Sequence, residues 1–175
     1  MNKVLVVVYS YTGTSRKVAD LLCSQQRWPM AEIVEIRPRA GAFGSFRCLL
    51  DSVFRRHPSI RYEGPRAKSF DAVVLVSPIW GQRLAGPMRS FVGTRRNHLP
   101  DVAVISVMGG RGAPNAVAEV SQLIGRAPIL DVAFTTHEVD NGSFATRLEA
   151  FGTAVRKAEG PQSTVRPADL SPQAA

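Results

Sequence analysis

The sequence predicts an α/β fold, a three-layer sandwich in which helices cover both faces of a five-stranded parallel sheet. Two observations predict it. Five short apolar segments of the 175-residue chain alternate with five segments of helical periodicity. The first apolar segment, Val4–Tyr9, begins as an unbroken Val and Leu run, which is typical of a strand buried on both faces.

The expected strands are short and rich in Val, Ile and Leu. In chain order they are Val4–Tyr9, Ile33–Ile36, Ala72–Val76, Val102–Val107 and Ile129–Thr135. Because crossovers between parallel strands are right-handed, the loops that lead from strand to helix all lie at one edge of the sheet. A ligand site is therefore expected at that edge.

The expected helices lie between the strands and after the last one. They are Thr14–Gln26, Phe43–Arg56, Gly86–Arg95, Pro114–Gly125 and Ser143–Ala158. Each places apolar residues at helical spacing on one face. Pro87 suits a first helical turn, and Asn141 or Ser143 is the expected cap of the last helix.

Length and composition indicate one domain over residues 1–159. Residues 160–175 are rich in Pro, Ser and Ala without periodicity, and we expect them to be disordered. No run approaches the roughly 18 apolar residues of a membrane span, and the amino terminus does not resemble a signal peptide. These features predict a cytoplasmic location.

The formal net charge of +8 is unevenly distributed, because residues 37–68 hold eight basic against two acidic residues. Such a surface could attract a nucleic acid, an anionic membrane or an acidic partner. No nucleic-acid motif or aromatic interleaving accompanies the charge, so we expect no nucleic-acid partner and favour a solvated face. A role of this segment in docking a partner stays open.

The cysteines and histidines do not form a recognisable metal or redox motif. Cys23 and Cys48 lie in apolar-periodic segments and are interpreted as packed thiols. His57, His98 and His137 are far apart in sequence, so no metal site is predicted.

The loop after the first strand is rich in hydroxyl groups. It comprises Ser10, Tyr11, Thr12, Gly13, Thr14 and Ser15, and it leads directly into a helix. Hydroxyls together with the free amides of a helix N-terminus form a phosphate site of neutral donors. The loop lacks the lysine of a triphosphate-binding loop and the three glycines of a dinucleotide fingerprint. The alternative is a helix cap without a ligand.

Two further loops at the same edge suit a planar ligand. After the third strand come Pro78, Ile79, Trp80 and Gly81, where Trp80 is the candidate for stacking on a ring. We interpret this segment as a loop because Pro and Gly bracket it. After the fourth strand come Met108, Gly109, Gly110 and Gly112, whose glycines allow a close approach of the backbone to a ligand.

The segment from Val6 to Ala19 resembles the FMN phosphate loop of flavodoxins and flavodoxin-like reductases. The family pattern is strand, aromatic, Ser, any residue, Thr-Gly-Asn-Thr and then a helix. Here Thr14 and Ser15 replace the usual Asn and Thr, and both keep a side-chain oxygen. The segment from Ser77 to Trp80 is similar to the third-strand loop of the same family. The resemblance implies a short-chain flavodoxin-like fold, with its five parallel strands in the order 2-1-3-4-5, and non-covalent FMN held by the residues of the three loops named above.

Three classes of function follow from an FMN site. Arg83 and Arg111 lie in the two ring-facing loops, and a cation there would stabilise the negative charge of a reduced flavin. That favours an FMN-dependent NAD(P)H oxidoreductase that delivers electrons to a quinone or similar acceptor. The alternatives are a one-electron carrier of flavodoxin type and a non-enzymatic module that uses the basic 37–68 surface. No residue is predicted as a catalytic acid or base, and homo-oligomerisation stays open.

Overall fold

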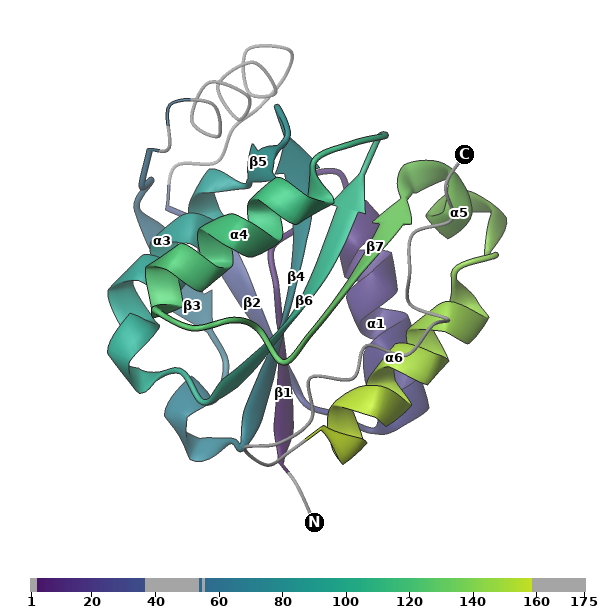
Figure 1. Cartoon of the computed structure of the whole chain (residues 1–175), viewed down its shortest axis with the longest axis horizontal. Helices are drawn as coiled ribbons and strands as arrows, with labels where there is room; N and C mark the ends of the chain where they lie inside the picture. Colours follow the sequence, from purple (N-terminus) through teal and green to yellow (C-terminus); the bar gives the residue numbers. More distant parts are fainter. Residues whose placement is uncertain (1–2, 37–53, 55, 159–175) are drawn as a thin grey trace.

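The structure is a computed structural model that describes residues 3–36, 54 and 56–158 (Figure 1). Most of the expected helix Phe43–Arg56, Cys48, the larger part of the basic 37–68 segment and the 160–175 tail lie outside the described residues.

A parallel sheet forms the centre of the molecule, and its strand order confirms the prediction. The parallel strands are β1 (Val4–Val8), β2 (Met30–Glu35), β4 (Ala72–Trp80), β6 (Asp101–Met108) and β7 (Leu130–Thr135). They pair in the order β2-β1-β4-β6-β7, which is the predicted 2-1-3-4-5.

Two antiparallel strands extend this sheet beyond the five that the sequence predicts. β3 (Ile60–Glu63) pairs with β2 at one edge, and β5 (Arg83–Leu84) pairs with the end of β4. β4 continues four residues beyond Val76, where we expected a loop. The chain reverses through Gly81 and Gln82, whose φ angles of 55° and 61° make a tight two-residue hairpin turn.

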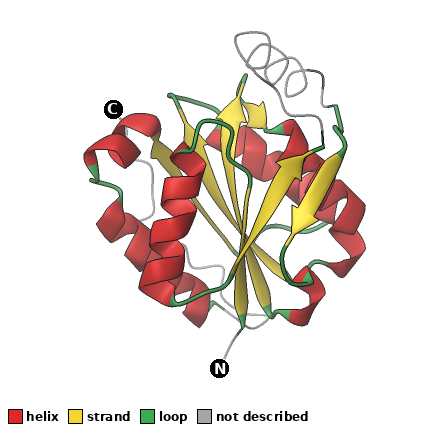
Figure 2. Ribbon diagram, turned by 180° about the vertical axis from the view of Figure 1, so that it is seen from behind, coloured by secondary structure: helices red, strands yellow, loops and turns green. Residues whose placement is uncertain are grey.

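Helices cover both faces of the sheet, as predicted (Figure 2). They are α1 (Thr14–Gln26), α3 (Gly86–Arg95), α4 (Ala113–Ile124), α5 (Thr136–Asn141) and α6 (Ala145–Lys157), with short 3₁₀ turns η1 (Ala67–Ser69) and η2 (Arg96–His98). No helix within the described ranges has both the length and the apolar character to cross a bilayer.

The end of the chain differs from its prediction. A capping box closes the start of α5, because Thr135 Oγ1 accepts the Glu138 amide while a Glu138 oxygen accepts the Thr135 amide. α6 starts separately after Phe144, without a capping side chain. The cap expected at Asn141 or Ser143 was therefore wrong: Asn141 Oδ1 instead accepts the Ser143 amide inside the connection.

Alternation along the central strands divides the core into two halves. Val4, Val6 and Val8 face the layer of α1, α5 and α6, whereas Leu5 and Val7 face α3 and α4. All five side chains are at most 1% exposed. Burial on both faces explains why β1 is an unbroken apolar run, and the resulting rigid sheet fixes the positions of the loops at its carboxyl edge.

Candidate functional site

A small cavity of about 90 Å³ lies at the carboxyl edge of the sheet, where the chain leaves β1, β4, β6 and β7. Its lining residues are Tyr11, Thr12, Thr14, Ser15, Pro78, Ile79, Trp80, Val107, Met108, Gly109 and Thr136. At roughly 30 Å³ per water molecule, the enclosed part has room for a group of phosphate size. The structure thus brings the three loops predicted from the sequence to one place.

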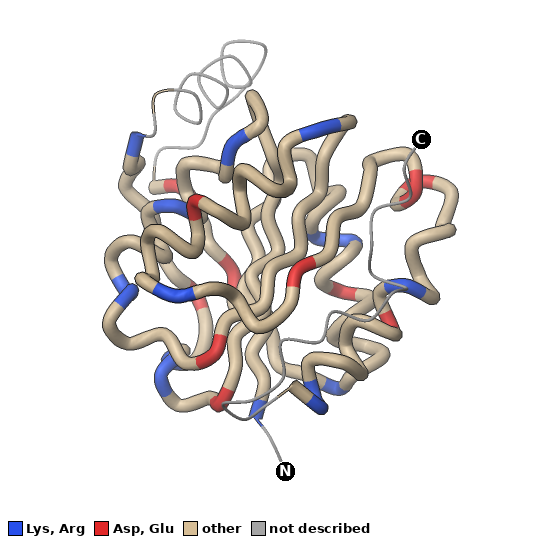
Figure 3. Tube along the Cα trace, in the orientation of Figure 1, with Lys and Arg blue, Asp and Glu red and all other residues tan. Residues whose placement is uncertain are grey.

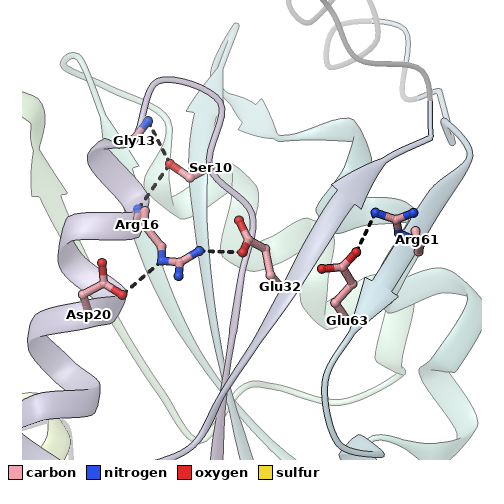
Figure 4. Close-up of polar contacts among 7 residues, drawn as sticks. All are labelled: Ser10, Gly13, Arg16, Asp20, Glu32, Arg61 and Glu63. Atoms are coloured by element: carbon pink, nitrogen blue, oxygen red, sulfur yellow. Dashed lines mark hydrogen bonds and ion pairs between the residues drawn. The ribbon is translucent and has the colours of Figure 1, made fainter.

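The loop after β1 is shaped by Ser10 and Gly13. Ser10 Oγ accepts the Gly13 amide at 3.1 Å and the Arg16 amide at 3.2 Å (Figure 4). Gly13 has a φ of +91°, a conformation that side chains disfavour, and its missing Cβ would meet nothing within 4 Å. Because Ser10 Oγ acts as an acceptor in both bonds, its O–H proton is left to donate to a ligand.

The amides of Thr14 and Ser15 are the first two of α1. The helical ladder starts one turn later, where the Lys17 amide donates to Gly13 O at 3.0 Å. The amides of Thr14 and Ser15 therefore have no acceptor within the helix. The hydroxyl oxygens of Thr12 and Thr14 lie 3.3 Å apart beside them. Neutral amide and hydroxyl donors therefore converge on the cavity.

The two cations that follow this loop are held by carboxylates. Arg16 Nη1 lies 2.5 Å from Glu32 Oε2, and Arg16 Nε lies 3.0 Å from Asp20 Oδ1 (Figure 4). The hydrogen bond to Glu32 is the main reason that the pKa of Arg16 is raised. Lys17 Nζ lies 3.6 Å from Asp140 Oδ1. The loop is therefore a site of neutral donors and not a cationic one.

An aromatic cluster forms the other wall of the cavity. Trp80, the last residue of β4, is half-buried and lies edge-to-face with Tyr9 and Tyr11, at centroid distances of 6.0 and 5.7 Å. Tyr9 Oη in turn donates to Glu35 Oε1 at 2.5 Å. These contacts hold the indole of Trp80 in place beside the phosphate-sized cavity.

A buried ion pair anchors the hairpin that presents Trp80. Arg89 Nε donates to Glu119 Oε1, and the two side chains are only 2% and 7% exposed. Arg89 Nη2 also donates to the carbonyl of Leu84 at 2.8 Å, and Glu119 Oε2 accepts the Leu84 amide at 3.3 Å. Leu84 is in β5, so the pair fixes the returning strand of the hairpin to α3 and α4.

Not every predicted residue lines the cavity. Ser10 and Gly13 belong to the loop after β1 but are not among the lining residues, and Gly110 is exposed with open space around it. Gly81 belongs to the hairpin turn. Gly112 has a φ of +112°, and a Cβ there would lie 2.5 Å from Gln82 Cα, so packing against the turn requires a glycine at this position.

Two lining residues were missed by the sequence reasoning. Val107 lies one residue before the glycine-rich loop, inside the predicted strand. Thr136 starts α5, and its Oγ1 is 3.4 Å from the carbonyl of Met108. Thr136 could have been found, because it follows a predicted parallel strand at the edge where ligands bind.

The two predicted ring-facing cations do not line the cavity that Trp80 lines. Arg83 is half-buried and lines a second cavity of about 410 Å³, between the hairpin turn and α4, together with Asn115 and Glu119. Arg111 is exposed in the loop after β6. In the part of the chain that the structure describes, no group of three or more His, Cys, Asp or Glu side chains could hold a metal ion.

A sandwich of this strand order with a phosphate-sized site at the end of its first strand defines the flavodoxin-like class of fold. No protein-family model and no curated protein matches the sequence. Solved structures of flavoproteins do match, at identities between 11% and 21%.

A flavoprotein from Lactobacillus acidophilus NCFM, solved in complex with FMN, has a TM-score of 0.67 and 21% identity, covering 82% of this chain and 99% of its own. A flavodoxin, WrbA-like protein from Agrobacterium tumefaciens has a TM-score of 0.58 and 11% identity, and the match covers 90% of this chain and 98% of that protein. An NADH:FMN oxidoreductase in its apo form has a TM-score of 0.56 and 11% identity, and the match covers 94% of this chain and 93% of that protein. The chain therefore has a flavodoxin-like fold, as the resemblance of its first loop predicted.

Proposed function

We propose that this chain binds FMN non-covalently at the carboxyl edge of its sheet and acts as an NAD(P)H-dependent oxidoreductase that passes electrons to a quinone or similar acceptor. One observation carries the proposal: neutral hydrogen-bond donors and the half-buried indole of Trp80 line the same phosphate-sized cavity. The solved flavoprotein from Lactobacillus acidophilus, which holds FMN, supports it.

The residues present fit FMN group by group. The amides of Thr14 and Ser15 and the hydroxyls of Ser10 and Thr12 would hold the phosphate. Trp80 would lie against the isoalloxazine ring. A Cβ at Gly109 would meet nothing within 4 Å, so the loop after β6 leaves open space on this side of the cavity.

Bound FMN would supply the redox chemistry, accepting electrons from a nicotinamide and releasing them to an acceptor. The residues of this chain bind and orient it. Arg83 and Arg111 lie in the two segments that flank Trp80, and reorientation of either toward the ring would stabilise its reduced anion. No acidic or basic side chain is assigned a proton-transfer role.

Calorimetric titration of the purified protein with FMN and with riboflavin tests the binding step. We expect FMN to bind at least tenfold more tightly, because only FMN carries the phosphate that the loop after β1 would hold. Trp80→Leu should weaken the binding of both ligands, since it removes the contact to the isoalloxazine ring that they share. Equal affinities for FMN and riboflavin, or no heat with either, would refute the site.

Turnover tests the class of function. We expect the FMN-loaded protein to oxidise NADH or NADPH steadily when benzoquinone is present, at a rate proportional to protein concentration. FMN binding without nicotinamide oxidation would favour the one-electron carrier. Absence of both activities would leave the non-enzymatic binding module.

A further inference from the structure

A separate groove lies toward the amino ends of the strands, and the residues that line it have no part in the Trp80 cavity. Its volume is about 210 Å³, and β3, η1 and the end of α3 form its walls. The lining residues, here called the basic groove, are Tyr62, Arg66, Ala67, Lys68, Arg95 and His98. η1 directly precedes β4 and η2 directly precedes β6, which places the groove at the edge opposite the Trp80 cavity.

The length of β4 separates the two sites. β4 has nine residues and ends at Trp80. At about 3.3 Å per residue the strand spans roughly 30 Å. A small ligand in the basic groove therefore cannot touch a group that lies against Trp80, and the groove is a separate site.

The groove gathers basic side chains that form no ion pair with a carboxylate of the described residues. Arg66, Lys68 and His98 are exposed and Arg95 is half-buried. Figure 3 shows Lys and Arg positions, with Asp and Glu positions between them, along the side of the molecule that α3 and β3 form. Gathering like charges is unfavourable, and a bound anion would relieve that repulsion.

The carboxylate nearest in sequence to Tyr62 is already paired. Glu63 Oε1 lies 2.6 Å from Arg61 Nη2 (Figure 4). Successive side chains of a strand point to opposite faces, so Arg61 and Glu63 lie on the face of β3 opposite Tyr62. Arg95 has a second reason for its position, because a cation is favourable in the last turn of a helix. Arg66 and Lys68 have no such reason, since they flank and belong to a short 3₁₀ turn.

The apolar wall of the groove is held in place before any ligand arrives. The rings of Tyr62 and Phe91 stack at a centroid distance of 5.2 Å and an angle of 28°. The guanidinium of Arg95 lies 4.9 Å from the Tyr62 centroid and 4.8 Å from that of Phe91. Tyr62 Oη donates to the carbonyl of Pro65 at 2.5 Å. Because these side chains are fixed beforehand, binding there orders fewer groups.

We propose that the basic groove binds a small soluble phosphate monoester, with its phosphate among Arg66, Lys68 and Arg95 and its organic part against Tyr62 and Ala67. A dianionic phosphate presents three terminal oxygens, which suits cations that converge from two separate elements. The volume equals that of about seven water molecules, enough for a phosphate and a compact body.

Two larger partners fit the groove less well. A polynucleotide needs an extended basic track with several stacking rings, whereas the rings that line this compact groove are those of Tyr62 and His98. An anionic membrane would need exposed apolar side chains beside the cations. The large exposed hydrophobic residues among those described are Ile36 and Phe54, and Ile36 follows the carboxyl end of β2, at the opposite edge.

Phenyl phosphate is the probe for a calorimetric test, with inorganic phosphate and phenol as its separate parts. We expect phenyl phosphate to bind more tightly than either part. The double substitution Arg66→Gln/Lys68→Gln should weaken binding at least tenfold. Lys3→Gln/Lys157→Gln removes the same charge from two exposed positions outside the groove and should leave the affinity within twofold.

The measurement is made on protein saturated with FMN and repeated on Ser10→Ala, so that binding in the loop after β1 is not counted. Affinity that falls with Ser10→Ala but not with Arg66→Gln/Lys68→Gln would overturn the proposal. So would equal losses in the two double variants, which would indicate a general charge effect. Binding only to vesicles containing phosphatidate, and not to phenyl phosphate, would replace the soluble ligand by a lipid. If FMN fails to bind but phenyl phosphate still depends on Arg66 and Lys68, the flavin proposal fails and the groove stands.

Discussion

The two walls of the Trp80 cavity are built in different ways. The loop after β1 is a local structure: Ser10 bonds to amides three and six residues away, and Gly13 supplies the turn into α1. The hairpin that ends in Trp80 depends on distant residues, because Glu119 lies 35 residues beyond Leu84, whose amide it accepts. One wall is therefore fixed by short-range hydrogen bonds and the other by buried tertiary contacts.

This difference implies that the walls respond differently to substitution. Changes in the loop should weaken binding of the phosphate and leave the rest of the molecule stable. Changes under the hairpin should destabilise the fold and move Trp80 with it. Comparing FMN with riboflavin separates the two effects, because only the first depends on the phosphate.

Arg89→Met is expected to have the largest effect. It leaves Glu119 buried without its cation, and breaking a buried pair in this way costs about 3–5 kcal/mol of unfolding free energy. Chemical denaturation measures it. The double variant Arg89→Met/Glu119→Leu removes both charges and should recover most of the loss. If the double variant is as unstable as the single one, the ion pair is not what anchors the hairpin.

Gly112→Ala should come next, with a loss of about 2–3 kcal/mol. Its φ of +112° disfavours any side chain, and the new Cβ would lie 2.5 Å from Gln82 Cα. Gly109→Ala is the matched control in the same loop, because nothing lies within 4 Å of a Cβ there and its φ is not positive. A thermal or urea midpoint that falls equally in both variants would show that the hairpin turn does not press on this loop.

The sequence was sufficient for the five parallel strands and for the loop after β1, because both follow from local patterns. Continuous apolar runs predict the central parallel strands, and Ser and Thr beside a helix start predict a neutral donor site. The capping box of Thr135 and Glu138 was also readable in the sequence, although α5 was not predicted.

The hairpin could not be predicted in the same way. Pro78 and Gly81 indicate a loop, yet β4 runs through Pro78 and ends one residue before Gly81. The turn needs Gln82 at a φ of +61°, a left-handed conformation that residues other than glycine disfavour. What stabilises it is a pair of charges on two different helices, and charged side chains at such positions are ordinarily read as exposed. The arrangement thus depends on contacts that no short window of sequence contains.

Ser10→Ala should have the smallest effect on stability and the most selective effect on binding. Its hydroxyl accepts two amides at the start of α1, and losing such a cap costs about 1 kcal/mol of unfolding free energy. The FMN affinity should fall about tenfold or more, since a hydrogen bond to a charged phosphate is also lost, while riboflavin binding stays the same. Ser24→Ala, an exposed serine on the same helix, is the control and should change neither ligand. Parallel losses for FMN and riboflavin would mean that the loop after β1 supports the ring as well, and the division between a local and a tertiary wall would not hold.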